Sequence, residues 1–438
     1  MRISVIGCGY LGAVHAASMA ALGHEVVGID RDHRKVEALS RGEAPFFEPD
    51  LSELLEQGRS AGRTLFSTDF HAIHDAQVHF VCVGTPQRPD SYAADVSCVD
   101  AAFSDLAAFA QDGSVVVGKS TVPVGTAARL AGEIADRGSS ALLVWNPEFL
   151  REGYAVRDTL HPDRLVYGVA DGSESNPAVA ILDEVYAGAI RRGVPRLVMD
   201  YPTAELVKVA ANSFLATKIS FINAMAELCE VAGGDVTQLA DAIGLDDRIG
   251  RRFLNAGLGF GGGCLPKDIR AFLARAEELH AEPAVSFLRE IDSINLRRRD
   301  RMVDLTQEVL QGRPLAGARI AVLGAAFKPD SDDVRDSPAL DVARKLADRG
   351  AEVVVTDPEA VPNARTVAPS LQFADTPEEA AEGADALLLL TEWRQYRDLD
   401  PDKLAERVRH CRILDGRNVL DPGIWRRAGW TYRALGRP

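Results

Sequence analysis

The first thirty residues, MRISVIGCGYLGAVHAASMAALGHEVVGID (1–30), contain the clearest structural pattern of this 438-residue chain. An apolar run at 3–6 enters the glycine-rich GCGYLG at 7–12, a small-residue segment continues to Ala21, and a second apolar run ends at Asp30. This order predicts a strand, a tight turn, a helix and a second strand. A unit of this kind is typical of a Rossmann-like parallel sheet.

The turn between these strands predicts a dinucleotide site. Gly7 permits the tight turn, Gly9 lets the backbone approach a pyrophosphate, and Gly12 lets the helix pack on the strand. The pyrophosphate would then lie at the positive end of the helix. Asp30 follows Gly12 by 18 positions, where a carboxylate can accept hydrogen bonds from both ribose hydroxyls and repel a 2′-phosphate. A turn that serves packing alone is the alternative, but the strand and helix context favours binding of NAD.

Three more strand patterns follow, at 78–86, 114–126 and 142–153. Their Val-rich runs alternate with helical segments, which predicts a parallel sheet buried on both faces. Ligands bind at the carboxyl ends of the strands in such sheets. The residues at those ends that we expect around the cofactor crevice are Thr85, Thr121, Glu148 and Glu152.

The chain changes character near Pro202. A helical pattern without Gly or Pro covers 203–231, and further helices are predicted to about Leu310. From Arg319 the first pattern returns, in RIAVLGAAFK (319–328), GAEVVVTD (350–357) and GADALLLLT (383–391), but without the GxGxxG spacing. A second dinucleotide is therefore not expected there.

We predict an α/β protein with two Rossmann-like doubly wound domains, joined by a helical central domain with a long helix. The predicted boundaries are 1–200 for the NAD-binding domain, 201–310 for the central domain and 311–438 for the second Rossmann-like domain. A helix of this length often forms a dimer interface.

Amino-acid composition indicates which kinds of partner the protein is not expected to bind. The formal net charge is −15, and the Lys and Arg residues are dispersed, which argues against nucleic acid or an anionic membrane as a partner. The chain begins with a strand pattern, has no secretory-type leader, and contains no apolar run of membrane-spanning length. We therefore expect a cytoplasmic protein. Its six cysteines form no CxxC pair and no zinc-type cluster, so no metal site is predicted.

The stretch GLGFGGGCLPKD (257–268) surrounds one cysteine with five glycines. Glycines let a ligand come close to the backbone. A helix that starts near Pro266 would place the Cys264 thiol at its N-terminus, where the helix field and Lys267 favour the thiolate. A purely structural loop is the alternative, and a catalytic cysteine is favoured.

Lys208 and Asn212 lie four residues apart in the long helical pattern, so they share a face. They could form a solvated stripe, but their neighbours are apolar, and a lysine beside an amide could hold an oxyanion or a water. Asp268 could be a general-base partner or a helix cap. Together with a dinucleotide, a thiolate suggests oxidation of an alcohol through a thiohemiacetal and a thioester.

These motifs together resemble the UDP-glucose/GDP-mannose dehydrogenase family. The segments that carry the resemblance are GCGYLG, VGTP, STVPVGT, NPEFLREG, ELVKVAANSFLATKISFIN, GFGGGCLPKD, GAAFKPDSDDVRDSP and DGRNVLDP, in order from Gly7 to Asn418. The resemblance implies NAD-dependent four-electron oxidation of a nucleotide sugar and a homodimer built on the central helical domain. The DGRN segment favours UDP-glucose, oxidised to UDP-glucuronate, and GDP-mannose is the alternative. GGGC around the thiol differs from the GGHC of relatives that oxidise N-acetylhexosamines.

The resemblance also implies roles for single residues. Cys264 resembles the nucleophile, Lys208 and Asn212 the oxyanion-stabilising pair, Asp268 their partner, and Glu148 and Thr121 residues that place or activate the hydrolytic water. The implied cofactor-binding residues are Gly7, Gly9, Gly12, Asp30, Lys35, Thr85, Thr121, Glu152 and Arg335. The implied substrate-binding residues are Glu148, Phe149, Leu150, Glu152, Lys208, Asn212, Arg248, Phe253, Gly261, Lys328 and Arg417, with Arg248 reaching into the neighbouring subunit.

Two other functions remain open from the residues. One is a sugar-nucleotide-binding regulator on the same scaffold, against which Cys264, Lys208 and Asp268 argue. The other is a two-electron alcohol dehydrogenase.

Overall fold

An eight-stranded sheet forms the centre of the N-terminal region in the computed structural model, which describes residues 1–437. Its strands are β1 (Arg2–Ile6), β2 (Glu25–Ile29), β3 (Thr64–Ser67), β4 (Val78–Val81), β5 (Val115–Gly118), β6 (Leu142–Trp145), β7 (Leu165–Val169) and β8 (Arg196–Asp200). The spatial order is β3-β2-β1-β4-β5-β6-β7-β8, and its first six strands are parallel, in the order of dinucleotide-binding sheets.

The seventh strand departs from the predicted parallel sheet. β7 runs antiparallel to β6 and meets it at one residue pair, Trp145 and Gly168. A Cβ on Gly118 of β5 would overlap the Trp145 ring, and a Cβ on Gly168 would meet Cβ of Ala204 at 2.5 Å and Cβ of Trp145 at 3.3 Å. Gly118 therefore makes room for the buried Trp145 ring where the strand direction reverses, and Gly168 makes room for Ala204.

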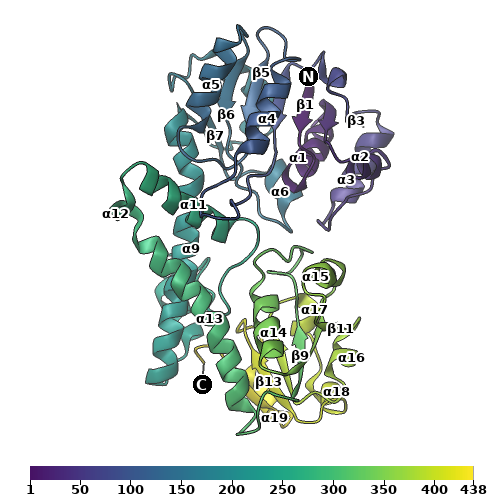
Figure 1. Cartoon of the computed structure of the whole chain (residues 1–438), viewed down its shortest axis with the longest axis vertical. Helices are drawn as coiled ribbons and strands as arrows, with labels where there is room; N and C mark the ends of the chain where they lie inside the picture. The colour runs from purple at the N-terminus through teal and green to yellow at the C-terminus, as the bar shows by residue number, and fades with distance from the viewer. Residues whose placement is uncertain (438) are drawn as a thin grey trace. The chain divides into compact units, whose positions relative to one another are not determined.

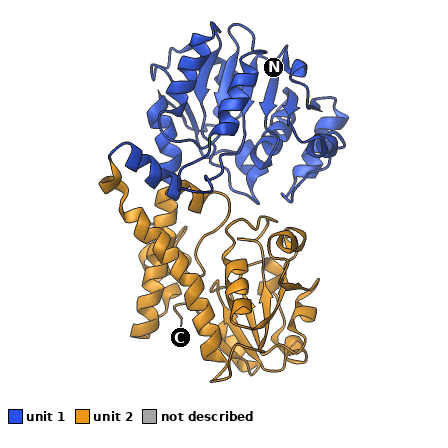
Figure 2. Ribbon diagram, viewed as in Figure 1, with its two compact units in different colours: residues 1–211, 270–280 blue, residues 212–269, 281–438 orange. Residues whose placement is uncertain are grey.

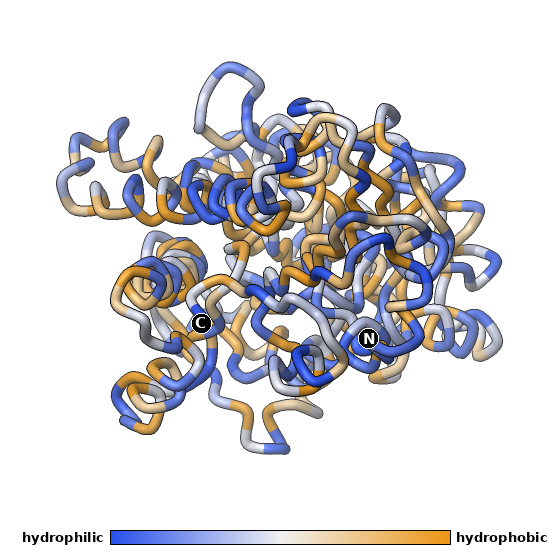
Figure 3. The backbone as a smooth tube through the Cα atoms, turned by 90° about the horizontal axis from the view of Figure 1, so that it is seen from below, coloured by the Kyte–Doolittle hydropathy of each residue, from blue (hydrophilic) through white to orange (hydrophobic). Residues whose placement is uncertain are grey.

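Helices cover both faces of this sheet (Figure 1). They are α1 (Tyr10–Ala21), α2 (His33–Ser40), α3 (Leu51–Ser60), η1 (Phe70–Ile73), α4 (Ser97–Leu106), α5 (Thr126–Asp136), α6 (Ala155–Leu160), α7 (Pro177–Val185) and α8 (Ala187–Arg191). Successive strand side chains point to opposite faces, so Ile3 and Val5 enter one apolar cluster and Ile6 enters the other. Figure 3 shows hydrophobic and hydrophilic residues alternating along the helices, as expected when one helix face is buried.

The middle of the chain is helical. Its helices are α9 (Tyr201–Ala232), α10 (Val236–Gly244), α11 (Leu265–Glu278), α12 (Glu282–Val285) and α13 (Phe287–Val309). The long helix predicted at 203–231 is confirmed by α9. Within residues 1–437, no helix is both long and apolar enough to cross a membrane.

A second sheet is built from β9 (Arg319–Leu323), β10 (Glu352–Thr356), β11 (Gln372–Phe373), β12 (Ala386–Leu389), β13 (Arg412–Asp415) and β14 (Thr431–Ala434). All its pairings are parallel, in the order β11-β10-β9-β12-β13-β14. Its helices are α14 (Pro338–Asp348), α15 (Val361–Val367), α16 (Pro377–Ala381), α17 (Arg394–Arg397), α18 (Pro401–Ala405) and α19 (Pro422–Arg427). The predicted pair of doubly wound domains is confirmed.

Asp357 ends β10 as Asp30 ends β2, but its surroundings differ. The Asp357 carboxylate is buried and accepts hydrogen bonds from the backbone of Ala325, Ala326, Glu359 and Ala360, and from the Trp393 indole. A carboxylate has about four lone-pair positions, so these protein donors occupy it fully. The Asp357 carboxylate therefore has no acceptor position left for a ribose hydroxyl.

The chain divides into two compact units, coloured separately in Figure 2. Unit 1 comprises residues 1–211 and 270–280, and unit 2 comprises 212–269 and 281–438. The predicted limits at 200 and 310 fall where β8 ends at Asp200 and just after α13 ends at Val309. The division into three domains with these limits stays a prediction.

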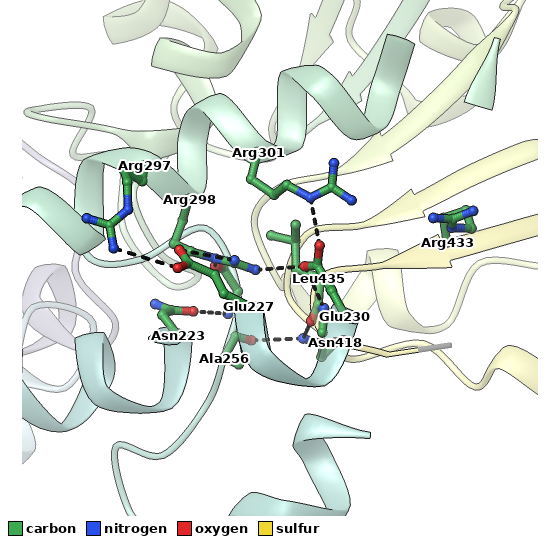
Figure 4. A network of polar contacts seen from close by, with 12 residues as sticks. Asn223, Glu227, Glu230, Ala256, Arg297, Arg298, Arg301, Asn418, Arg433 and Leu435 are labelled. Carbon is green, nitrogen blue, oxygen red and sulfur yellow. Dashed lines mark hydrogen bonds and ion pairs between the residues drawn. The ribbon is translucent and has the colours of Figure 1, made fainter. Parts of the chain in front are cut away.

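A buried ion-pair network joins α9 to α13 inside unit 2 (Figure 4). Arg298 of α13 has no exposed side-chain surface and lies 3.3 Å from Glu230 and 3.7 Å from Glu227, both on α9. Glu230 also pairs with Arg301 at 2.6 Å and accepts the backbone N–H of Gly436 at 3.0 Å. Because a buried arginine is stable only with paired charges, these carboxylates fix the register of the two helices.

Candidate active site

The glycine turn of unit 1 has the shape of a dinucleotide cradle. Gly7 has φ +87, and its N–H donates to the carbonyl of Ile29 at 2.8 Å. A Cβ on Gly12 would overlap the carbonyl oxygen of Gly7, so only glycine lets α1 pack this closely. A Cβ on Gly9 would meet no atom within 4 Å. Gly9 therefore borders open space at the N-terminus of α1, where a pyrophosphate fits.

Asp30 lies directly after β2 and is partly exposed. Its Oδ2 accepts the backbone N–H of Cys8 at 2.9 Å, and its Oδ1 accepts that of Asp32 at 2.9 Å. Each oxygen keeps a lone pair, since a carboxylate offers about four acceptor positions. These two lone pairs can accept hydrogen bonds from two ribose hydroxyls. Lys35, the next predicted cofactor residue, is half-buried in α2.

The segments after β4 and β5 are joined by two predicted residues. The Thr85 hydroxyl is buried and donates to the carbonyl of Thr121 at 2.8 Å. Farther along, Glu205 of α9 accepts the N–H groups of Gly125 and Ala127 at 2.7 Å each, at the start of α5. The start of α9 is thereby anchored to the segment that follows Thr121.

Glu148 follows β6 and is held from two sides. Its Oε1 accepts the N–H groups of Phe149 at 2.8 Å and Leu150 at 3.0 Å, and its Oε2 lies 3.0 Å from Nζ of Lys119. Burial raises the pKa of the Glu148 carboxyl, but the Lys119 charge and these hydrogen bonds outweigh burial, so that its pKa lies below the usual value. Glu152, four residues later, is buried.

Two cations approach the ring of Phe149. Cζ of Arg164 lies 3.8 Å from the ring centroid, and Nζ of Lys208 lies 5.7 Å from it. Lys208 is half-buried on α9. The structure thus brings together three predicted residues of unit 1, with Lys208 near Phe149 and Phe149 next to Glu148.

Unit 2 carries the predicted nucleophile. Cys264 is exposed and stands immediately before α11, and its carbonyl oxygen accepts the N–H of Asp268 at 2.9 Å. This is the first hydrogen bond of the helix, so Cys264 occupies the N-cap position. The predicted helix start near Pro266 is confirmed. Positive charge at the helix N-terminus stabilises an anion at this position.

Asp268 connects α11 to α9. Only 2% of its side chain is exposed, its Oδ1 lies 2.7 Å from Nζ of Lys267, and its Oδ2 accepts the Asn212 amide at 2.6 Å. Lys267, whose charge we expected to favour the Cys264 thiolate, forms an ion pair with Asp268. Asn212 keeps a second amide N–H for another acceptor.

The glycines before Cys264 have a packing role that differs from the predicted one. A Cβ on Gly261 would overlap the carbonyl oxygen of Asp336, one on Gly262 would meet the Phe327 ring at 2.7 Å, and one on Gly263 would overlap the Arg335 guanidinium. We expected these glycines to make room for a ligand. In the structure, the space beside them is filled by the 327–336 segment.

The backbone of this loop is held by buried side chains that the sequence analysis did not identify. Asn295 of α13 is fully buried, accepts the N–H of Phe260 at 2.7 Å and donates to its carbonyl at 3.0 Å. Asn223 of α9 accepts the N–H of Gly257 at 2.8 Å. Nothing local in the sequence singles out these amides, because their partners lie far along the chain.

Four predicted residues of unit 2 have protein partners. Arg417 donates to the carbonyl oxygens of Leu390, Gly259 and Phe327 at 2.7, 3.1 and 3.1 Å. Arg335 pairs with Asp333 at 2.7 Å, and Arg248 pairs with Asp246 at 2.7 Å, with 62% and 89% of their side chains exposed. Nζ of Lys328 lies 5.2 Å from the Phe327 ring centroid. Phe253 is half-buried and has φ +66, a rare value for a residue with a side chain.

Comparisons with known proteins cover the whole chain. Residues 1–190 match the NAD binding domain of the UDP-glucose/GDP-mannose dehydrogenase family, 202–297 match its central domain, and 321–422 match its UDP binding domain. The UDP-glucose 6-dehydrogenase of Rhizobium meliloti is 42% identical, with all of both chains covered. That of Pseudomonas aeruginosa is 40% identical over all of this chain and 98% of its own.

The chain belongs to the UDP-glucose/GDP-mannose dehydrogenase family.

Solved structures agree with this assignment. A UDP-glucose dehydrogenase from the hyperthermophilic archaeon Pyrobaculum islandicum has a TM-score of 0.89 at 38% identity, covering 100% of this chain and 98% of that one. A UDP-D-ManNAc dehydrogenase from Pyrococcus horikoshii has a TM-score of 0.86 at 27% identity, covering 100% and 99%.

Membership confirms the predicted class, cofactor and ligand type. This family member is an oxidoreductase whose N-terminal domain binds NAD and whose C-terminal domain is of the UDP-binding kind. The open space at Gly9 and the accessible Asp30 carboxylate fit NAD. Within residues 1–437, no group of three or more His, Cys, Asp or Glu side chains could hold a metal ion.

Proposed function

We propose that this protein oxidises UDP-glucose to UDP-glucuronate in two NAD-dependent steps, with Cys264 as the nucleophile. The observation that carries the proposal is the exposed Cys264 at the N-cap of α11, one turn before the buried Asp268. The relatives that are 38–42% identical over the full chain and named UDP-glucose 6-dehydrogenase support this substrate.

The chemistry requires four electrons to leave the C6 alcohol of the sugar. NAD, when bound, would supply the hydride acceptor for each of two oxidations. In the first oxidation the C6 carbon loses a hydride and the C6 hydroxyl loses its proton to solvent, which leaves an aldehyde. The Cys264 thiolate forms a bond to the aldehyde carbon, and the C=O electron pair becomes an alkoxide, which gives a thiohemiacetal. The second oxidation restores the C=O bond and leaves a thioester. Water then forms a C–O bond, the C–S bond breaks, the sulfur departs as thiolate, and two protons pass to solvent.

The surrounding residues suit these steps. We propose that the Lys208 ammonium and the remaining Asn212 N–H stabilise the alkoxide, because preorganised donors act most strongly where charge develops. Asp268 keeps Asn212 oriented through its hydrogen bond of 2.6 Å. Glu148 and Thr121 would place the hydrolytic water. The remaining predicted contacts to NAD and to the nucleotide sugar are part of this proposal.

We further propose a homodimer built on α9. Phe214, Phe221 and Leu228 follow one another at intervals of seven residues on this helix, and their exposed fractions are 67%, 47% and 60%. Seven residues are nearly two helical turns, so these side chains form one exposed apolar stripe. Large apolar side chains gathered in this way are typical of protein interfaces.

Substrate and stoichiometry test the enzymatic proposal together. NADH formation should be fastest with UDP-glucose in a panel that also contains GDP-mannose and UDP-N-acetylhexosamines, with two NADH formed per sugar consumed. A ratio of one would indicate a two-electron dehydrogenase, and no turnover with any of them would indicate a binding protein.

The nucleophile is tested by substitution. Cys264→Ala and Cys264→Ser should form no acid but bind NAD with unchanged affinity, because the dinucleotide cradle lies around Gly9 and Asp30. Normal turnover in either variant would refute the thioester route. Cys98→Ala is the matched control, since Cys98 is also exposed but lies outside the proposed site.

A further inference from the structure

A lysine is buried at the end of a central strand in unit 1. Lys119 follows β5, and 3% of its side chain is exposed. Its Nζ lies 3.0 Å from Oε2 of Glu148, donates to Oδ1 of Asn146 at 3.0 Å and lies 3.5 Å from the Tyr186 hydroxyl. The Phe80 ring centroid is 5.9 Å away. Such a lysine is tolerated only with close partners, because burial of an unpaired charge is costly.

The partners are themselves fixed. The Tyr186 hydroxyl donates to Oδ1 of Asn146 at 2.9 Å, and the Asn146 amide donates to the carbonyl of Val166 on β7 at 2.9 Å. The ammonium is therefore held at one point by two strands and a helix end. Burial alone would lower the pKa of Lys119, but Glu148 and Tyr186 raise it above the usual value, so the lysine stays charged.

Lys119 and the backbone together hold both oxygens of Glu148. Oε2 faces the ammonium, while Oε1 accepts the N–H groups of Phe149 and Leu150. Only 18% of the Glu148 side chain is exposed, so most of its surface is in contact with protein. A carboxylate clamped in this way can accept a hydrogen bond from water in one direction only.

We propose that Lys119 is a positioning residue for thioester hydrolysis: its buried ion pair keeps Glu148 anionic and in one orientation, so that Glu148 aligns the attacking water. The inference rests on the proposed function, in which a Cys264 thioester is hydrolysed.

The ion pair also decides between two roles for Glu148. A general base works best when its pKa lies near the working pH. The pKa of Glu148 lies below its ordinary value despite burial, because Lys119 opposes the effect of burial. Glu148 is thus a weak proton acceptor and a strong hydrogen-bond acceptor, which suits alignment of water and release of its protons to solvent.

The test uses Lys119→Met, which removes the charge and keeps much of the side-chain length. Hydride transfer should continue, whereas hydrolysis should slow at least about tenfold, equivalent to about 1.4 kcal/mol of barrier. Rapid mixing with NAD and UDP-glucose should then show a burst of two NADH per active site, followed by slow turnover. Intact-protein mass spectrometry should detect an acyl group on Cys264 during the slow phase. A variant that shows no burst and turns over like the parent would overturn the inference.

A pH profile separates positioning from mere stabilisation. The charged or titratable groups that act on Glu148 or respond to it are Lys119, Lys208, Tyr186 and Cys82. Without Lys119, burial should raise the Glu148 pKa, so the acid limb of hydrolysis should move to higher pH. A purely structural lysine would lower the melting temperature and leave the limb in place.

Three further variants keep the outcome decisive. Tyr186→Phe removes a hydroxyl from the same network but leaves the Lys119–Glu148 pair, so it should not accumulate thioester. Lys119→Arg keeps the charge and should hydrolyse faster than Lys119→Met. If Lys119→Met does not fold, Lys119→Gln makes the same test with a neutral hydrogen-bonding side chain. Failure of acid formation in the parent protein would contradict the proposed function, whereas normal hydrolysis in Lys119→Met or Lys119→Gln would contradict the role of Lys119 alone.

Discussion

Gly261 and Gly263 lie in one loop but differ in how well each position would tolerate a side chain. A Cβ at Gly261 would overlap the backbone carbonyl of Asp336, whereas a Cβ at Gly263 would overlap only the tip of the Arg335 side chain. Backbone atoms are fixed by their neighbours, but a side-chain tip can rotate away. The two positions therefore form a matched pair.

We expect Gly261→Ala to destabilise unit 2 by about 1–3 kcal/mol, as overpacking usually does, and to reduce thiol-dependent turnover by displacing the loop before Cys264. Gly263→Ala should cost less in stability. Chemical denaturation measures the loss of stability, and the rate of Cys264 alkylation measures the displacement of the loop. Equal losses of stability in both variants would show that the close contact of Gly261 with the Asp336 carbonyl is not what excludes a side chain from this loop.

The role proposed for Cys264 could be inferred from the sequence, whereas the role proposed for Lys119 could not. The glycines, Pro266 and Asp268 lie within a few positions of the thiol, so their pattern predicts a helix start at the right place. Lys119 appears in the sequence only as a charged residue after a valine run. The role proposed for Lys119 depends on its burial and on its contact with Glu148, which follows the next strand, β6.

The pairing of β1 with β4 includes a buried histidine, His79, which makes it sensitive to pH. Ser4 lies opposite His79 in the register, and the Ser4 hydroxyl is 2.8 Å from Nδ1 of His79. Burial lowers the pKa of His79 to about 4 and lowers that of His15, which packs on the same strand through Phe80, well below its usual value. Both histidines are therefore neutral in the folded protein over most of the acidic range.

We predict that the protein loses stability as the pH falls from about 6.5 to about 4. In this window the unfolded chain binds protons at His79 and the folded protein does not, so the free energy of unfolding rises with pH. Each pKa unit is worth about 1.4 kcal/mol, and the drop to about 4 makes the His79 contribution on the order of 3 kcal/mol.

Denaturant titrations at several pH values measure this slope. His79→Gln should flatten it, whereas the exposed His71→Gln should leave it unchanged. A parent protein equally stable at both ends of the window would contradict the prediction.

The elements themselves were predictable to different degrees. The strands and glycine turns of both Rossmann-like domains have local signals, and β1, β2, β9 and β10 match them. The reversal of strand direction at β7 has no local signal in the sequence, because β7 meets β6 at a single residue pair, Trp145 and Gly168. The packing of the 327–336 segment on Gly261 was likewise invisible in the sequence, since either a ligand or a protein loop could explain the same glycines.

The assembly of two copies is tested on α9. Phe221→Glu places a charge in the middle of the exposed stripe, so we expect a monomer in light scattering coupled to size-exclusion chromatography. Val367→Glu is the control, because Val367 is 48% exposed and lies on α15, outside the stripe. A parent protein that is monomeric at micromolar concentration, or a dimer that survives Phe221→Glu, would rule out this interface.

The network around Glu230 also has a consequence for synthesis of the chain. Glu230 on α9 accepts the N–H of Gly436, and Asn418 bridges the carbonyl oxygens of Ala256 and Leu435 at 3.1 and 2.8 Å (Figure 4). Domains form from the N-terminal side as the ribosome proceeds. α9 and Ala256, at the start of the Cys264 loop, therefore gain these contacts only after residue 436 has been made.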